Sequence, residues 1–178
     1  MKKRLRLIQV VNVRWFNASA WYGLFLSRLL KEAGHEVLVI CPPETESWRK
    51  AESLDLAPLG MDLNSAGPLR LPALLRALKS LVLSFRPHLV NCHRGEGLIL
   101  WGALKALGLP FALVRTRGDQ RPPRNNLPNR LLHARGVDAV IATSTRGLIA
   151  CRDLLRTPPD KLHLILGGVD QEHFRFSE

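Results

Sequence analysis

The sequence predicts a single α/β domain, a three-layer α/β/α sandwich with a parallel sheet of about seven strands. Three observations predict it. Short apolar runs alternate with longer segments of helical periodicity along the whole chain. The length of 178 residues fits one ordinary domain of roughly 100–200 residues. Hydrophobic residues make up 46% and charged residues 23%, which is the balance of a globular protein and excludes disorder.

The first third of the chain gives two clear strands and one clear helix. Residues 5–11 are mostly apolar and form the first expected strand, and residues 19–33 follow with apolar side chains at helical spacing. Gly34 is expected to end this helix, because glycine readily adopts the left-handed conformation after a helix. Residues 36–41 are the second strand, closed by two prolines. A short helix and a weak third strand are expected at residues 44–53 and 56–59.

The rest of the chain repeats the strand–helix alternation. Residues 72–86 carry leucines on one side of a helix that Pro87 ends, and residues 88–92 are the next strand. A helix at residues 96–107 stops at Gly108. The remaining expected elements are a strand at 111–115, a helix at 127–135, a strand at 139–142, a helix at 145–155 and a strand at 162–166.

Composition bounds the compartment and the partners. The three cysteines, Cys41, Cys92 and Cys151, are far apart and lack metal-ligand spacing, which excludes a disulfide scaffold or a zinc module and indicates a reducing compartment. Apolar runs are broken before the ~20 residues that a membrane span needs, so a soluble protein is expected. The net charge of +11 favours anionic partners.

Ligands of parallel sheets bind at the carboxyl ends of the strands, which directs attention to the loops there. The first loop holds Arg14, Trp15, Asn17 and Ser19, without the glycine motifs of a dinucleotide site or a P-loop. It precedes a helix N-terminus, which favours anions, and Asn17 or Ser19 is suited to cap that helix. Arg14 is either an anion ligand or a solvated side chain. Trp15 either forms a platform for a sugar or lipid, or folds onto the core.

Two later loops carry further candidates. His93 follows a strand, where it either donates to a phosphate or acts as acid or base, or is a structural histidine. Glu96 suits the N-terminus of the next helix. Six arginines stand between residues 115 and 135 against one acid, Asp119. Such a segment is either a solvated basic face or a site for a phosphorylated sugar, a lipid head group or nucleic acid.

Four landmarks together indicate a family. They are GHEV at residues 34–37, RPHLVNCH at 86–93, GVDAVIATS at 136–144, and LGGVD at 166–170 followed by Phe174. In this order and spacing they resemble the N-terminal half of GT-B glycosyltransferases, and most of all the nucleotide-sugar-dependent, retaining family four. The resemblance spans residues 4 to about 176.

The resemblance implies a Rossmann-like, acceptor-binding domain over residues 1–170, one half of a GT-B fold. Residues 171–178 would begin the linker to a C-terminal donor domain, which carries the family's E-x7-E motif and is not part of this chain. The parent would be a hexosyltransferase that needs no metal or other cofactor and uses a nucleotide-sugar as substrate. Its acceptor would be a glycan or a lipid-linked glycan in cell-envelope polysaccharide or lipopolysaccharide synthesis, and the chain alone would be inactive. The expected location is the cytoplasm, with peripheral contact to an anionic membrane at its inner face.

The family's functional residues carry over to part of this sequence. His93 matches the second histidine of the family's H-x-H and is the predicted catalytic residue, while Asn91 replaces the first. Gly118 stands where many relatives have a histidine. Arg14 and Asn17 are the residues predicted to contact the donor diphosphate. The predicted acceptor-binding residues are Trp15, Arg94, Glu96, Arg117, Asp119, Arg121 and Arg124.

Two other functions fit the same residues. One is a stand-alone, non-catalytic α/β module that binds an anionic ligand. The other is nucleic-acid binding through residues 115–135, with a steep dependence on salt. No aromatic residue lies in that segment, which argues against recognition of single strands, so no nucleic-acid partner is expected.

Overall fold

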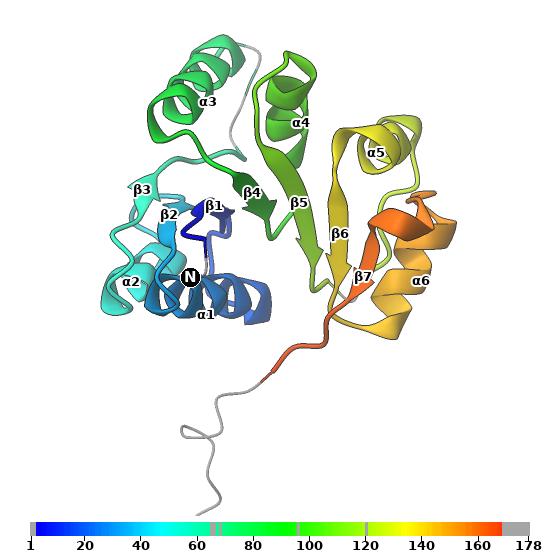
Figure 1. Ribbon diagram of the computed structural model, residues 1–178, viewed down its shortest axis with the longest axis horizontal. Coiled ribbons are helices and arrows are strands. Elements are labelled where there is room, and N and C mark those ends of the chain that lie inside the picture. Colours follow the sequence, from blue (N-terminus) through cyan, green and yellow to red (C-terminus); the bar gives the residue numbers. More distant parts are fainter. Residues whose placement is uncertain (1–2, 65–66, 68, 96, 120, 169–178) are drawn as a thin grey trace, which may run out of the picture.

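The computed structural model describes residues 3–64, 67, 69–95, 97–119 and 121–168. Within these residues the sheet has seven strands in the order β3-β2-β1-β4-β5-β6-β7, and every neighbouring pair is parallel (Figure 1). The strands are β1 Arg6–Val10, β2 Glu36–Cys41, β3 Leu59–Gly60, β4 Leu89–Cys92, β5 Ala112–Arg117, β6 Ala139–Ala142 and β7 Leu162–Leu164. The predicted all-parallel α/β sheet of about seven strands is confirmed.

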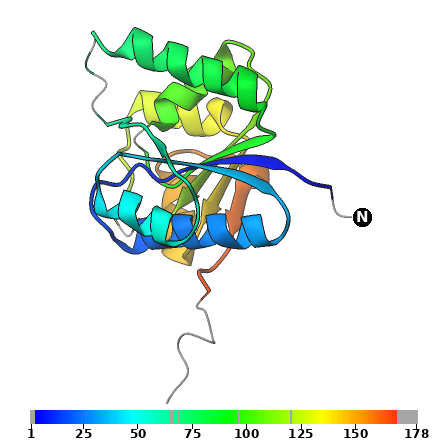
Figure 2. The same ribbon diagram turned by 90° about the vertical axis from the view of Figure 1, so that its left-hand side faces the viewer.

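Helices cover both faces of the sheet, as Figure 2 shows with α3 above it and α1 and α2 below it. The helices are α1 Ala18–Glu32, α2 Glu46–Ser53, α3 Leu71–Phe85, α4 Leu98–Ala106, α5 Leu127–Leu131 and α6 Thr145–Asp153. Buried apolar residues of α1 and α2 pack with strand residues in one cluster. Those of α3, α4 and α6 pack with other strand residues in a second, larger cluster. The two clusters lie on opposite faces of the sheet because successive residues of a strand point to opposite sides.

The centre of the sheet is the position at which its winding reverses. Strand β1 lies between β2 and β4, so the chain first winds outward to β3 and then crosses back through α3 to β4. In open parallel sheets a crevice forms at the carboxyl ends of the strands beside such a reversal. The fold therefore places the loops after β1 and β4 at the expected ligand crevice.

Most elements differ from their predicted bounds at one or both ends, and three of the differences bear on the site or the topology. Strand β5 continues to Arg117, so Thr116 and Arg117 belong to the sheet rather than to the following loop. Strand β3 is reduced to Leu59–Gly60. The helix expected at 127–135 ends early as α5 and continues as a π-helical turn, η1, over Leu132–Gly136, in which Val137 N donates to Leu132 O at 3.0 Å. A 3-10 turn, η2 at Pro159–Lys161, also precedes β7.

Local capping explains the helix ends. Gly34 has a φ of +88° directly after α1, as predicted for a closing glycine. Asn17 caps α1 and Ser144 caps α6 through side-chain oxygens that accept from the backbone N–H groups of Ala20 and Gly147. Among the residues that the structure describes, no helix is both long enough and apolar enough to cross a membrane.

Candidate functional site

A cavity of about 200 Å³ lies at the carboxyl edge of the sheet, beside the start of α1. Helix α1 contributes Ala18, Ser19 and Tyr22 to its wall. The ends of the strands and the segment after β7 contribute His93, Thr116, Gly118, Thr143 and Gly167. The fold thus brings segments that are far apart in sequence to one cavity, in the crevice that a parallel sheet provides.

His93 lies in a buried polar network below this cavity. Its side chain is 2% exposed, and its Nε2 is 2.7 Å from Oε1 of Gln9. The Asn91 amide donates to the same Gln9 oxygen at 3.1 Å, and the Thr116 hydroxyl donates to the Asn91 oxygen at 2.9 Å. Because the amide oxygen of Gln9 only accepts, the geometry assigns the imidazole proton to Nε2. Nδ1 is then the acceptor nitrogen, and no described residue hydrogen-bonds to it.

His93 is neutral at physiological pH. Burial, together with the nearby positive charge of Arg115, lowers the pKa of His93 to about 3. A neutral imidazole does not act as an imidazolium acid, but its Nδ1 can accept a hydrogen bond from a hydroxyl group. Chemically, the site is therefore suited to orienting a hydroxyl group, with the imidazole held in one tautomer by Gln9.

The network needs a close approach of α1 to β1 and β4, and Gly23 permits it. A Cβ atom at Gly23 would lie 2.8 Å from Cγ2 of Val11 and 3.0 Å from two ring carbons of His93. Any larger residue would displace the imidazole or the helix. Gly23 and Gln9 were missed by sequence reasoning. The signal that could have found Gln9 is its polar side chain in an otherwise apolar strand.

Stability should fall as the pH drops below 6.5. Burial lowers the pKa of His93 to about 3 and that of His133 to about 4, whereas the unfolded chain protonates both near the ordinary value of 6.5. Between pH 6.5 and 4 the unfolded state therefore binds more protons, and each histidine contributes a slope of up to about 1.4 kcal/mol per pH unit. Urea denaturation at a series of pH values measures this slope.

A matched pair of variants isolates the contribution of His93. His93→Gln should reduce the slope by about half, because one of the two buried imidazoles is gone. His163→Gln should leave the slope unchanged, because His163 is exposed in the folded protein. An unaltered slope in His93→Gln would contradict the buried, neutral state of His93.

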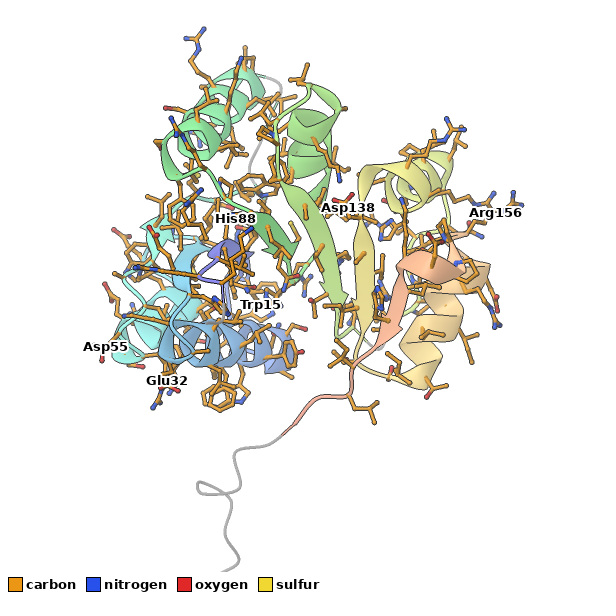
Figure 3. All side chains as sticks on the ribbon, viewed as in Figure 1. Trp15, Glu32, Asp55, His88, Asp138 and Arg156 are labelled. Carbon is orange, nitrogen blue, oxygen red and sulfur yellow. The ribbon has the colours of Figure 1, made fainter. Side chains whose placement is uncertain are left out.

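The first-loop residues lie apart from the wall of the cavity. The Asn17 side-chain oxygen is committed to the cap of α1 at 3.0 Å from Ala20 N, which leaves its amide group for a ligand. Arg14 pairs with Asp62 at 3.2 Å on the surface. Trp15, which Figure 3 labels, is 64% exposed, so it does not fold onto the core. An exposed indole ring is compatible with the predicted sugar or lipid platform.

The arginines between residues 115 and 135 do not form one solvated face. Arg115 and Arg117 are residues of β5 and are 2% and 8% exposed. Nη2 of Arg115 lies 3.3 Å from Asp119 Oδ2, and Arg94 lies 3.9 Å from the other oxygen of Asp119. Arg117 donates to the backbone carbonyl of Arg121. Strand alternation turns Arg115 and Arg117 away from Thr116 and the His93 cavity, toward the helices on the opposite face.

The predicted residues therefore fall into three groups. His93 lies at the cavity, and Arg14, Trp15 and Asn17 lie on the loop before α1. Arg94, Arg117, Asp119 and the backbone of Arg121 form a third group together with Arg115. Arg124 is exposed in the loop after β5, with its carbonyl accepting from the Asn129 amide at 3.0 Å. Glu96 lies outside the described residues. Within the described part of the chain, no three His, Cys, Asp or Glu side chains are placed to hold a metal ion.

The fold and the crevice define the class of protein: this is a Rossmann-like domain of the kind that forms the N-terminal half of GT-B glycosyltransferases. The model of Glycosyltransferase Family 4 matches residues 20–173, and the chain belongs to that family. The resemblance drawn from the four sequence landmarks is confirmed. None of the curated proteins compared with the chain matches it.

Solved structures agree on the fold. A glycosyltransferase from Rickettsia africae ESF-5 superposes with a TM-score of 0.79 at 16% identity, over 97% of this chain and 45% of that one. HepE of Anabaena, solved in complex with UDP-glucose, gives 0.73 at 14%, over 98% and 47%. MurG of Acinetobacter baumannii gives 0.66 at 12%, over 93% and 47%. The chain thus spans less than half the length of these proteins.

Proposed function

We propose that this chain is the acceptor-side domain of a nucleotide-sugar-dependent hexosyltransferase. The acceptor is a glycan or a lipid-linked glycan of cell-envelope polysaccharide or lipopolysaccharide synthesis. The observation that carries the proposal is the cavity at the carboxyl edge of the sheet, with His93 buried in its wall and held in one tautomer. The family membership and the UDP-glucose bound to HepE of Anabaena support a sugar nucleotide as donor.

In this proposal the chain's own residues position the acceptor and the donor phosphates. The reacting acceptor hydroxyl donates a hydrogen bond to Nδ1 of His93, which Gln9 keeps unprotonated. Arg14 and the free amide of Asn17 contact the donor diphosphate, and the helix N-terminus beside them favours negative charge. The acceptor oxygen forms the new bond to the anomeric carbon of the sugar while the bond from that carbon to the diphosphate breaks. The hydroxyl proton of the acceptor leaves with the nucleoside diphosphate, because the buried His93 imidazole stays neutral and only orients the hydroxyl group. We expect no metal to be needed, because arginine and helix-terminal N–H groups supply the compensating charge.

The partner that completes the site is a C-terminal donor domain. The test is to read the frame past codon 178, express the resulting protein, and assay sugar transfer from UDP-glucose and other sugar nucleotides. We expect transfer by the longer protein and none by the 178-residue chain. His93→Ala should lower kcat/KM by about 10–100-fold, because the variant loses one hydrogen bond to an oxygen on which charge develops in the transition state. His163→Ala, an exposed change of the same kind, should not.

A longer protein that lacks a donor domain, or one that carries the domain but transfers no sugar from any nucleotide donor, would overturn this function. An unimpaired His93→Ala enzyme would overturn only the role of His93.

We further propose that α3 holds the protein against an anionic membrane, where a lipid-linked acceptor resides. Residues 63–95 contain no Asp or Glu. The surface of α3 and its ends carries exposed Arg70, Arg76 and Lys79 beside Leu69 and Leu83, which are 95% and 57% exposed. Basic and apolar side chains in one patch suit a bilayer interface, with each cation contributing about 1 kcal/mol.

Co-sedimentation with vesicles tests this contact. Vesicles with anionic lipid should bind the chain at low salt and release it at high salt, and zwitterionic vesicles should not bind. The double variant Arg76→Gln with Lys79→Gln should weaken binding by about tenfold or more, at about 1 kcal/mol for each lost cation. Arg49→Gln with Lys50→Gln on α2 removes the same charge elsewhere and is the control. Equal binding of all vesicles would contradict the proposal.

A further inference from the structure

Two neighbouring arginines on β5 are buried on the side of the sheet that faces α4, η1 and α6. Arg115 and Arg117 are two residues apart, so both point to the same face. Both are more than nine-tenths buried. Their positive charges reach the groups around them. They contribute to lowering the pKa of His133 in η1, after the dominant effect of burial, and they counteract the rise that burial causes in the pKa of Cys151 in α6.

The two arginines differ in their hydrogen-bond and ion-pair partners. Arg115 donates to the carbonyls of Cys92 and Thr116 at 2.9 and 2.5 Å and pairs with Asp119. Among the residues that the structure describes, Arg117 donates only to the carbonyl of Arg121, makes no ion pair with a carboxylate, and has a buried Nε–H without a hydrogen-bond partner. An unpaired charged donor in a protein interior is costly, because it has lost water without gaining an acceptor.

The balance of charge around Arg117 indicates which kind of group would accept a hydrogen bond from its Nε–H. Asp119 is the carboxylate that pairs with Arg115, and it is shared with Arg94. Among the described residues, Asp119 is therefore the one carboxylate that pairs with either of the two buried guanidinium groups, and it pairs with Arg115. A phosphate group carries more than one negative charge near neutral pH and accepts bidentate bonds from the Nε and Nη edge of a guanidinium. Asp119 and Arg94 are each 28% exposed, so the cluster borders on solvent at the carboxyl edge.

We infer that Arg117, supported by Arg115, binds a phosphate group of the acceptor. The inference rests on the proposed transferase function and adds to it that the acceptor is phosphorylated, as a sugar phosphate or a phosphate-linked lipid is. Arg117 follows Thr116, which lines the His93 cavity, and the two side chains point to opposite faces at the end of β5. An acceptor that extends around this end of the strand can have its phosphate at Arg117 and its hydroxyl group at His93. The first-loop residues proposed for the donor lie beside α1, on the other face.

The Nε–H group of Arg117 is itself the reporter. In ¹H–¹⁵N spectra of the 178-residue chain, titration with inorganic phosphate should shift the Arg117 Nε–H signal in a saturable way. Saturating UDP should leave that shift in place, because the donor diphosphate is not the ligand here. An Arg117 signal that does not respond to phosphate would overturn the inference. A shift that UDP abolishes would assign the site to the donor and overturn it as well.

Matched variants separate the site from general electrostatics. Arg117→Gln should weaken phosphate binding by at least about tenfold, and Arg117→Lys, which keeps the charge but loses the fork, should be intermediate. Arg49→Gln, an exposed change of equal charge on α2, should alter affinity less than about twofold. Equal effects at residues 117 and 49 would contradict the inference. If Arg117→Gln does not fold by circular dichroism, the wild-type titration decides alone.

The outcome is independent of the transferase test. Phosphate binding is measured without sugar transfer, so an active transferase with a silent Arg117 would overturn only this inference. A longer protein that binds phosphate at Arg117 but transfers no sugar would overturn only the proposed function.

Discussion

Replacing Trp101 with alanine is expected to lower the free energy of unfolding by about 3–5 kcal/mol. Trp101 lies in α4 and is the largest of the fully buried side chains. Its indole ring meets the ring of Phe111 edge to face, with the ring centroids 5.8 Å apart. Domains of this size have total stabilities of about 5–15 kcal/mol, so the variant should be unfolded or nearly so at physiological temperature. Urea denaturation followed by circular dichroism measures the loss.

Two further variants show whether burial is the cause. Trp15→Ala makes the same chemical change at a 64% exposed position and should alter stability by no more than about 0.5 kcal/mol. Trp101→Phe keeps an aromatic ring and removes an indole N–H that has no hydrogen-bond partner in the described structure, so it should cost much less than alanine. Equal losses in Trp15→Ala and Trp101→Ala would refute the packing described here.

Replacing Gly23 with alanine should destabilise the protein by about 1–3 kcal/mol, although alanine is the better helix former by about 1 kcal/mol. The added methyl group would lie 2.8 Å from Val11 Cγ2 and 3.0 Å from the His93 ring, so the ring or the helix must move. We therefore expect the His93 imidazole resonances to shift in NMR spectra. In the proposed transferase, this displacement should also lower kcat/KM.

The same substitution at an open glycine is the control. A Cβ atom at Gly67 would meet nothing within 4 Å, so Gly67→Ala should be neutral or stabilising by up to about 1 kcal/mol. A Gly23→Ala variant that is as stable as Gly67→Ala would show that α1 does not press against His93.

Much of the fold follows from local sequence pattern. The strand at Glu36–Cys41 and the strand at Ala139–Ala142 have the predicted bounds, because each is an apolar run closed by a clear break. The π-helical turn after α5 could not be predicted in this way. Its extra residue accompanies a tertiary contact, in which the Leu132 side chain packs over Gly102 of α4 and over Gly136. Helical periodicity contains no information on such a contact.

The site was less predictable than the fold. The rule that ligands bind at the carboxyl ends of parallel strands pointed to His93 and to the loop before α1, and these residues do lie at that edge. The sequence could not show that Arg117 belongs to β5, because arginine is typical of a polar loop and two buried arginines are rare. Gln9 and Gly23 act through contacts with residues more than sixty positions away, which a single sequence does not encode locally.

The outermost strands of the sheet are its shortest, with two residues in β3 and three in β7. A long exposed edge invites another chain to add a strand, which leads to swapped dimers and fibres. The short edge strands of this sheet offer few free backbone N–H and C=O groups for such an addition. In the proposed transferase, the donor domain can therefore lie close to the carboxyl edge, and move relative to it, without pairing its strands with this sheet.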